Sequence, residues 1–270
     1  MRTLRTRLHD FLYDATTRRW AYQRLAGLLF QAGLVRFGAL YCTYVPDAFF
    51  VFRRHPEWNE LLARFMRRNR SNNGGDIPRM LAFILNIQQV LDEKIPGDFA
   101  ELGVWRGNSA AILAAYAGRS ARRVFLFDTF TGFTARDLQG IDRVHDRKFF
   151  DTSLELVRRT IGAEDQHCTY VKGYFPDSVG EEHRNRHYAV VSLDCDLYEP
   201  MRAGLEFFYP LMPRGGIFLL HDYSNLLWAG AKLAVDEFCE ARGEFLVLVP
   251  DKSGSAFFRK AKDYDSLVDR

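Results

Sequence analysis

The chain has 270 residues, of which 47% are hydrophobic, and a formal net charge of only +3. This composition allows one large α/β domain with an appendage, and it argues against global disorder and against a dedicated nucleic-acid binder. We expect no signal peptide, and the apolar stretches fall short of the ~18 residues that a membrane-spanning helix needs. The scattered cysteines form no C-x-x-C pair. Reduced thiols and a cytoplasmic location are therefore expected.

The N-terminal part of the chain is basic and amphipathic. Residues 1–46 hold seven arginines and two aspartates, with apolar residues at helical spacing. This pattern predicts helices that pack on the domain or on a second subunit, so a homo-oligomer is expected. The alternative is a helix that contacts an anionic membrane surface. Helices are also expected at 55–70 and at 77–91, the second capped by Asp76. We predict a helical extension over residues 1–97, which serves oligomerisation or acts as a lid.

The stretch ELGVWRGNSA predicts a strand, a glycine loop and the start of a helix. Glycines let a ligand approach the backbone, and the N–H groups at a helix start favour an anionic group. The pattern is E-x-G-x-x-x-G, which does not match the dinucleotide fingerprint. It suits S-adenosylmethionine, whose ammonium would meet Glu101 and whose carboxylate would meet the backbone. Gly103, Gly107 and Ser109 are the other expected contacts. A plain turn between strand and helix is the alternative.

The next strand, in RRVFLFDTF, ends on Asp128. An acid at the tip of the second strand is placed to hold the two ribose hydroxyls of a nucleoside. Asp128 follows Gly103 by 25 residues, close to the spacing of ~20 that is typical of such a unit. Asp128 is therefore predicted to bind the cofactor.

Strands and helices alternate from residue 98 onward. Strands are expected near 99–102, 124–128, 168–172, 188–194, 216–221, 244–249 and 255–260, and helices near 109–117, 151–161, 199–210 and 229–242. This alternation predicts an α/β fold with a mostly parallel, Rossmann-like sheet over residues 98–270. Only DKSGS separates the last two strands, so the last strand should be antiparallel. The irregular segment 131–148 follows a strand tip on the ligand side and is predicted to be a substrate lid.

Two later strands end in unusual charge. Asp194 and Asp196 follow one strand, and His221 and Asp222 follow the next. The carboxyl ends of parallel strands meet at one edge, so these side chains should converge. The sequence shows no basic residue beside them, and we expect a divalent cation to relieve their repulsion. Oxygen ligands favour Mg²⁺, while the histidine also admits Mn²⁺, Fe²⁺ or Zn²⁺. Simple helix capping by Asp194 or Asp222 is the alternative.

The segments ELGVWRGNSA, FLFDTFTGF, VKGYFPDS, VSLDCDLYEP, GGIFLLHDY and AVDEF occur in this order. In combination they resemble the macrocin O-methyltransferase family, over residues 86–258. The resemblance implies a class I methyltransferase fold, S-adenosylmethionine as methyl donor, and a Mg²⁺ ion. It also implies that sugar hydroxyls on macrolides and related natural products are the acceptors.

The resemblance further implies roles for individual residues. Asp194 and the pair His221–Asp222 match the family's metal ligands, although histidine replaces the first acid of that pair. Asp196 matches a general base, and His221 is the alternative base. Gly173 and Phe175, within VKGYFPDS, are implied cofactor contacts.

We therefore predict a metal-dependent O-methyltransferase that acts on a hydroxyl of a small-molecule or glycan acceptor. Two other hypotheses stay open. Asp194–Cys195–Asp196 is also a D-x-D sequence, which is the metal motif of many nucleotide-sugar glycosyltransferases. The chain could alternatively be a non-catalytic peripheral membrane or scaffold protein that keeps the fold.

Overall fold

The computed structural model describes residues 76–146 and 148–261. All of these residues belong to one compact unit of the chain. The basic segment 1–46 and the helix predicted at 55–70 lie outside the described residues. Every helix among the described residues is too short or too polar to cross a membrane.

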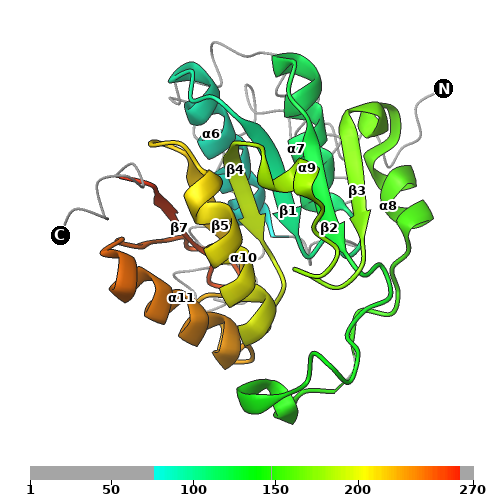
Figure 1. The fold of residues 1–270 in the computed structure, drawn as a ribbon, viewed down its shortest axis with the longest axis vertical. Coiled ribbons are helices and arrows are strands. Elements are labelled where there is room, and N and C mark those ends of the chain that lie inside the picture. Colours follow the sequence, from blue (N-terminus) through cyan, green and yellow to red (C-terminus); the bar gives the residue numbers. More distant parts are fainter. Residues whose placement is uncertain (1–75, 147, 262–270) are drawn as a thin grey trace, which may run out of the picture. The chain divides into compact units, whose positions relative to one another are not determined.

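The described residues form one seven-stranded sheet with the order β3-β2-β1-β4-β5-β7-β6 (Figure 1). Its strands are β1 (Asp98–Leu102), β2 (Val124–Asp128), β3 (Cys168–Lys172), β4 (Tyr188–Leu193), β5 (Ile217–Leu220), β6 (Val247–Leu248) and β7 (Ala256–Arg259). Strands β1 to β5 pair in parallel. Strand β7 runs antiparallel to both β5 and β6. The predicted mostly parallel sheet with an antiparallel last strand is confirmed.

Helices cover both faces of this sheet. They are α6 (Ile77–Asp92), α7 (Asn108–Ser120), α8 (Leu154–Ile161), α9 (Glu181–Arg184), α10 (Tyr198–Leu211) and α11 (Ala229–Arg242). Helices α6 and α7 pack against each other on one face, and α10 and α11 pack against each other on the opposite face (Figure 1). Because both faces are covered, β4 and β5 are buried along their whole length and are almost entirely apolar.

Helix α6 belongs to the core of this domain. Asp76 caps it, because its carboxylate accepts a hydrogen bond from the Arg79 backbone N–H at 3.1 Å, as the sequence predicted. The apolar face of the helix is fully buried through Met80, Ile84 and Ile87. Helix α6 packs on β4 and β5 as well as on α7. It is therefore part of the layer that covers the sheet.

Two predicted elements are shorter in the structure. The helix expected from 151 begins at Leu154, because the Ser153 hydroxyl accepts a hydrogen bond from the Leu156 N–H and caps it. The strand expected at 244–249 is reduced to Val247–Leu248 at the edge of the sheet. Both of its side chains are exposed, and Pro250 follows without an N–H to extend the pairing.

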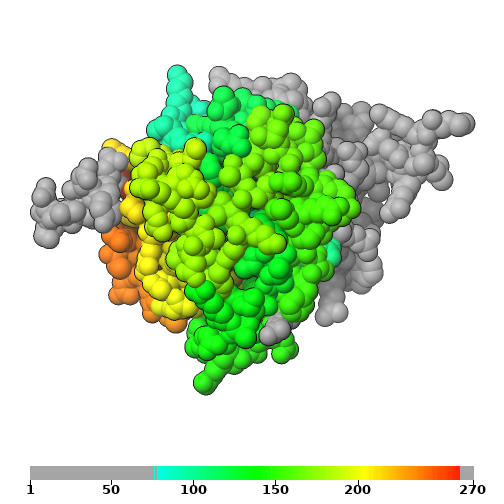
Figure 2. Space-filling model, turned by 45° about the vertical axis from the view of Figure 1, so that its right-hand side comes forward, coloured from blue at the N-terminus to red at the C-terminus, as the bar shows by residue number. Residues whose placement is uncertain are grey.

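The segment between β2 and α8 is irregular, as predicted, apart from the short 3₁₀ helix η1 (Gly140–Val144). Its two ends meet where the Phe133 N–H donates to the Lys148 carbonyl at 3.0 Å. Asp142 fastens its middle, because the buried carboxylate accepts a hydrogen bond from the Tyr198 N–H at the start of α10 at 2.7 Å. In Figure 2 this part of the chain, in green, protrudes at the lower edge of the visible face. We refer to residues 131–149 as the lid segment.

Candidate active site

A cavity of about 350 Å³ opens at the carboxyl ends of the parallel strands. Most of the predicted site residues line it, namely Gly103, Asp128, Gly173, Phe175, Asp194, Asp196, His221 and Asp222. The lid segment, the start of α6 and the loop between β6 and β7 complete the wall. Ligand cavities of open parallel sheets lie at this edge, and the size is within their usual range.

The four polar residues that follow β4 and β5 lie close together, as the sequence predicted. One ligand atom from each of Asp194, Asp196, His221 and Asp222 can be chosen so that all lie within 4.8 Å of one another. Asp196 and Asp222 also share an unusual backbone conformation, with φ of 62° and 57°. Non-glycine residues rarely adopt this left-handed conformation, and aspartate is among those that tolerate it. The backbone is thus bent at both strand ends in a way that aims two acids at one point.

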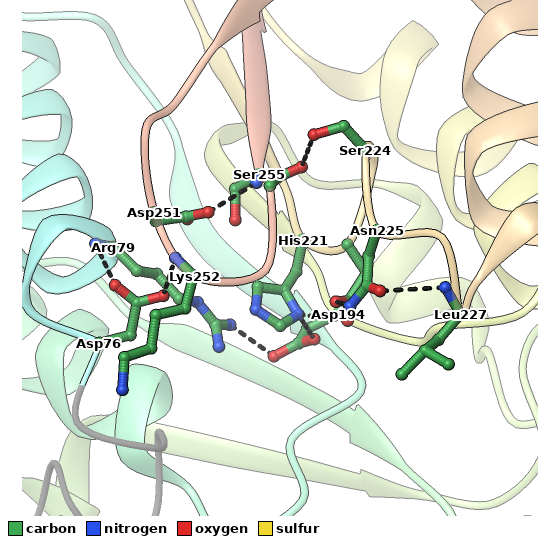
Figure 3. A network of polar contacts seen from close by, with 12 residues as sticks. Asp76, Arg79, Asp194, His221, Ser224, Asn225, Leu227, Asp251, Lys252 and Ser255 are labelled. Carbon is green, nitrogen blue, oxygen red and sulfur yellow. Dashed lines mark hydrogen bonds and ion pairs between the residues drawn. The ribbon is translucent and has the colours of Figure 1, made fainter. Parts of the chain in front are cut away.

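The prediction that the acids lack a basic partner is wrong. The Arg79 guanidinium Nη2 lies 2.5 Å from Asp194 Oδ2 (Figure 3). Arg79 comes from the first turn of α6, and its side chain is only 10% exposed. The sequence gave no sign of this contact, because 115 residues separate the two partners.

His221 supplies a second positive charge. Its Nδ1 lies 2.6 Å from a carboxylate oxygen of Asp194 and 2.6 Å from one of Asp222. Burial and the nearby Arg79 oppose the imidazolium form, but these two carboxylates outweigh them and raise the pKa of His221 to about 9. Burial also opposes ionisation of Asp194, yet Arg79 and His221 hold the pKa of Asp194 well below its usual range. Asp194 is thus an anion between two cations at neutral pH.

Asp196 has the opposite character. Burial, together with the acids Asp222 and Asp194, raises its pKa well above the usual value. Like charges at close range disfavour the ionised form of Asp196. Burial likewise raises the pKa of the Cys195 thiol far above its usual value. Cys195 is therefore a packed small residue and has no nucleophilic character.

The glycine loop is held by Asp128. One carboxylate oxygen of Asp128 accepts hydrogen bonds from the Val104 N–H at 2.6 Å and the Trp105 N–H at 3.1 Å. The other oxygen accepts from the Phe130 N–H at 2.6 Å. The anion that meets the loop N–H groups is thus this carboxylate. The Thr129 side chain also hydrogen-bonds to Asp128, whose carboxylate lines the cavity.

Three predicted cofactor contacts do not line the cavity. Glu101 is fully buried beneath it, and burial raises the pKa of Glu101 to about 8 although hydrogen bonds from Ser109 and Ser192 oppose this shift. Gly107 serves packing, because a Cβ there would lie 2.9 Å from Val157 Cγ1 in α8. Glu101, Gly107 and Ser109 are thus not among the residues that line this cavity, and their contact with the cofactor stays a prediction.

Aromatic side chains that the sequence did not single out form another part of the wall. Phe133 and Phe149, at the two ends of the lid segment, have ring centroids 5.0 Å apart. Phe149 also packs against Trp105 of the glycine loop at 5.6 Å, and Phe133 against Trp228 at 6.0 Å. These four rings line the cavity together. Only the position of the lid segment could have indicated two of them in advance.

Comparison with known proteins identifies a family. Residues 74–260 match the family model described as Macrocin-O-methyltransferase (TylF). This match covers more than half of the chain and includes every residue of the cavity wall.

Curated relatives are O-methyltransferases by their printed names. The 8-demethyl-8-(2,3-dimethoxy-alpha-L-rhamnosyl)-tetracenomycin-C 4'-O-methyltransferase of Streptomyces olivaceus is 34% identical over 51% of this chain and 57% of its own length. The demethyldecarbamoylnovobiocin O-methyltransferase of Streptomyces niveus is 32% identical over 56% of this chain and 62% of its own length. The matched part of the chain thus spans about three fifths of these relatives.

Solved structures agree with the fold. The O-methyltransferase NovP superimposes with a TM-score of 0.63 and 21% identity, covering 77% of this chain and 100% of that chain. The calicheamicin methyltransferase CalS11 gives a TM-score of 0.57 and 23% identity, covering 80% and 95%. The predicted class I methyltransferase fold is confirmed.

Proposed function

The chain belongs to the macrocin O-methyltransferase family, and from this premise we propose that it moves a methyl group from S-adenosylmethionine to a hydroxyl on a sugar of a natural product or glycan. One observation carries the proposal. A single cavity joins the glycine loop and Asp128, which suit a nucleoside, to the acid cluster of Asp194, Asp196 and Asp222. The printed name of the Streptomyces olivaceus relative, a 4'-O-methyltransferase of a rhamnosyl-bearing tetracenomycin, supports a sugar acceptor.

The cavity fits S-adenosylmethionine on the side of β1, β2 and β3. Gly103 lines this side, and it lets the loop approach the end of β4 closely, since a Cβ would lie 2.1 Å from the Asp194 carbonyl oxygen. Asp128, Gly173 and Phe175 line the same side, and the Asp128 carboxylate would accept a hydrogen bond from a ribose hydroxyl. Glu101 and Ser109 would act from behind, by supporting the loop. The cofactor supplies an electrophilic methyl group on a sulfonium.

The protein's own part in the reaction is to orient the acceptor and to remove its proton. The bond from sulfur to the methyl carbon breaks as the bond from the acceptor oxygen to that carbon forms, and the hydroxyl proton leaves to a base. We assign the base to the Asp196 carboxylate, which lines the cavity. Asp196 must be ionised to take the proton, and a cation held by the neighbouring acids would oppose the burial and like charges that raise its pKa.

The proposal includes a divalent cation, most simply Mg²⁺. The donor set fits one, because three carboxylates and an imidazole present ligand atoms within 4.8 Å of one another. Asp194, His221 and Asp222 would hold it, and a histidine must be neutral to ligate a metal, so binding should release the His221 proton. A cation at this place would lower the pKa of a coordinated acceptor hydroxyl.

Calorimetric titration tests the cofactor assignment. Wild-type protein should bind S-adenosylmethionine and should not bind a nucleotide sugar, which a D-x-D glycosyltransferase would prefer. In Asp128→Asn, an amide NH₂ group replaces one carboxylate oxygen, so a donor faces the loop N–H groups where an acceptor lay before. Affinity for S-adenosylmethionine should then fall about tenfold or more. An exposed acid outside the cavity, Glu240→Gln on α11, is the control and should change nothing. Binding of the nucleotide sugar alone would refute the proposal.

A further inference from the structure

Arg79 is an unexpected member of the acid cluster. Its backbone N–H donates to the capping Asp76 carboxylate at 3.1 Å, which fixes the start of the helix. Two contacts fix its side chain, because its guanidinium lies 5.6 Å from the Phe83 ring centroid and its Nη2 lies 2.5 Å from Asp194 Oδ2. Figure 3 shows the Arg79 side chain reaching toward the Asp194 carboxylate, which His221 also contacts. The helix start and the aromatic contact thus hold a permanent positive charge at the acid cluster.

The contact has a consequence for charge balance. Arg79 faces Glu101 and Asp222 in addition to Asp194. The guanidinium stays protonated at every accessible pH, so its charge is constant. The Asp194 carboxylate is therefore already paired with a side chain of the same protein, and a cation that takes Asp194 as ligand would meet a fixed positive charge there.

We propose that Arg79 is a built-in counter-cation of the acid cluster, which holds Asp194 while no divalent cation is bound and which the cation displaces when it binds. This inference rests on the metal site of the proposed function. Asp76 offers the displaced guanidinium a second carboxylate, since the two charges already attract each other across the helix start. Arg79 thereby lowers the affinity for the cation and stabilises the protein without it.

Direct measurement of cation binding tests the proposal. Mn²⁺ is the probe, with the free ion quantified by electron paramagnetic resonance in wild type and in Arg79→Met. Removing a unit charge a few ångströms from the ion should tighten Mn²⁺ binding by about tenfold or more. Arg79→Lys keeps the charge and should bind Mn²⁺ within a few-fold of wild type. Equal or weaker binding in Arg79→Met, or tight binding in Arg79→Lys, overturns the proposal.

Thermal unfolding gives an independent readout. Removing one partner of a buried ion pair leaves an uncompensated charge, so Arg79→Met should melt at a lower temperature than wild type. Added Mg²⁺ should restore most of this loss, because the ion replaces the missing charge. Arg186→Met is the matched control. It breaks an Arg–Asp pair of 2.9 Å with Asp98 at the other end of β1, and Mg²⁺ should not restore its stability.

A second variant covers the case in which Arg79→Met does not fold. Arg79→Met/Asp194→Asn removes both charges of the pair, so it should fold and should bind Mn²⁺ more weakly than wild type. A double variant that binds Mn²⁺ as tightly as wild type overturns the proposal. Titration of S-adenosylmethionine into the wild-type protein tests the proposed cofactor binding independently of the cation. Cofactor binding without any Mn²⁺ binding in wild type or Arg79→Met refutes the inference and leaves the methyltransferase assignment standing.

Discussion

Asp194 and Asp196 lie two residues apart at the end of β4 and have opposite electrostatic surroundings. Arg79 and His221 keep Asp194 ionised, whereas burial and Asp222 favour the protonated form of Asp196. Two carboxylates whose pKa values are pushed apart commonly divide the tasks of a site. We assign charge anchoring to Asp194 and proton removal to Asp196, whose ionised form a cation at the acid cluster would favour.

This division predicts the outcome of two substitutions. Asp196→Asn should retain cofactor binding and slow turnover by ~10²–10⁴, the usual contribution of positioned proton transfer. His221→Asp should keep cation binding, because it restores an oxygen ligand of the kind that Mg²⁺ prefers. Steady-state rates, with calorimetry as the binding control, check both. Near-normal turnover in Asp196→Asn with almost none in His221→Asp would assign the base to His221.

Glu101 makes a separate prediction about stability and pH. Its pKa is about 8 in the folded protein, against an ordinary value of 4.5. Between these values the unfolded chain has lost the proton that the folded chain keeps. The free energy of unfolding should therefore fall as pH rises through this window, by at most about 1.4 kcal/mol per pH unit.

Glu101→Gln removes this titration. Relative to wild type, the variant should gain stability steadily between about pH 4.5 and pH 8, because all other titrating groups are shared. Urea denaturation at pH 5 and at pH 8 measures the difference. A wild-type-minus-variant difference that is the same at both pH values would contradict the burial of a protonated carboxyl.

At the level of residues, the sequence predicted those positions whose neighbours follow from strand order. Asp194, Asp196, His221 and Asp222 converge because parallel strands end at one edge. Arg79 could not be predicted, since its contact depends on how α6 crosses the sheet. The role of Glu101 was equally hidden, because a strand pattern shows that a side chain is buried and leaves open which ligand it reaches.

Among the elements, the lid segment carries the clearest prediction. Asp142 caps α10 through the Tyr198 N–H, and Gly230 of α11 leaves room for its carboxylate, since a Cβ there would lie 2.3 Å from Asp142 Oδ1. Asp142→Ala should cost about 1 kcal/mol, as the loss of a helix cap does. It should also release the lid segment, which raises the KM for the acceptor.

Gly230→Ala should have the same effect as Asp142→Ala, because the added methyl group displaces the carboxylate. Asp146→Ala, which changes an exposed acid of the same segment, is the control. Limited proteolysis of the lid segment and acceptor KM measure the outcome. Proteolysis of Asp142→Ala and Gly230→Ala at the same rate as Asp146→Ala would refute the proposal that Asp142 holds the lid segment in place.

The order of strands and helices was predictable because the spacing of apolar residues in the sequence differs between the two. The irregular course of the lid segment was also foreseen from its length. The role of Asp142 in holding this segment could not be predicted, since its carboxylate contacts helices that begin at residues 198 and 229. The length of the edge strand β6 was overestimated, because the apolar residues that suggested a longer strand are exposed.

For the molecule as a whole, the position of α6 sets where the catalytic domain begins. The boundary predicted at residue 97 separates this helix from the sheet that it covers, and the family match begins at residue 74. We propose that the domain includes α6. A protein of residues 98–270 lacks the buried Ile84 and Ile87 as well as Arg79, so it should not melt cooperatively, whereas residues 74–270 should. Calorimetric melting decides, and a cooperative transition in residues 98–270 would contradict this boundary.

Oligomerisation and membrane-surface contact, both assigned to residues 1–46 from the sequence, remain proposals. Light scattering of the full chain and of residues 74–270 tests the first, and fewer chains per particle in the shorter protein would support it. Co-sedimentation with anionic vesicles tests the second.

The central claim is transfer of a methyl group from S-adenosylmethionine to a sugar hydroxyl. The most direct measurement incubates the full chain with S-adenosylmethionine that carries a ¹³C-labelled methyl group, with Mg²⁺ and with a panel of rhamnosylated polyketides. We predict that S-adenosylhomocysteine forms in step with an acceptor that gains one labelled methyl ether on its sugar, seen by mass spectrometry and nuclear magnetic resonance. Label on a nitrogen or carbon atom of the acceptor, or sugar transfer from a nucleotide sugar without methyl transfer, would contradict the account.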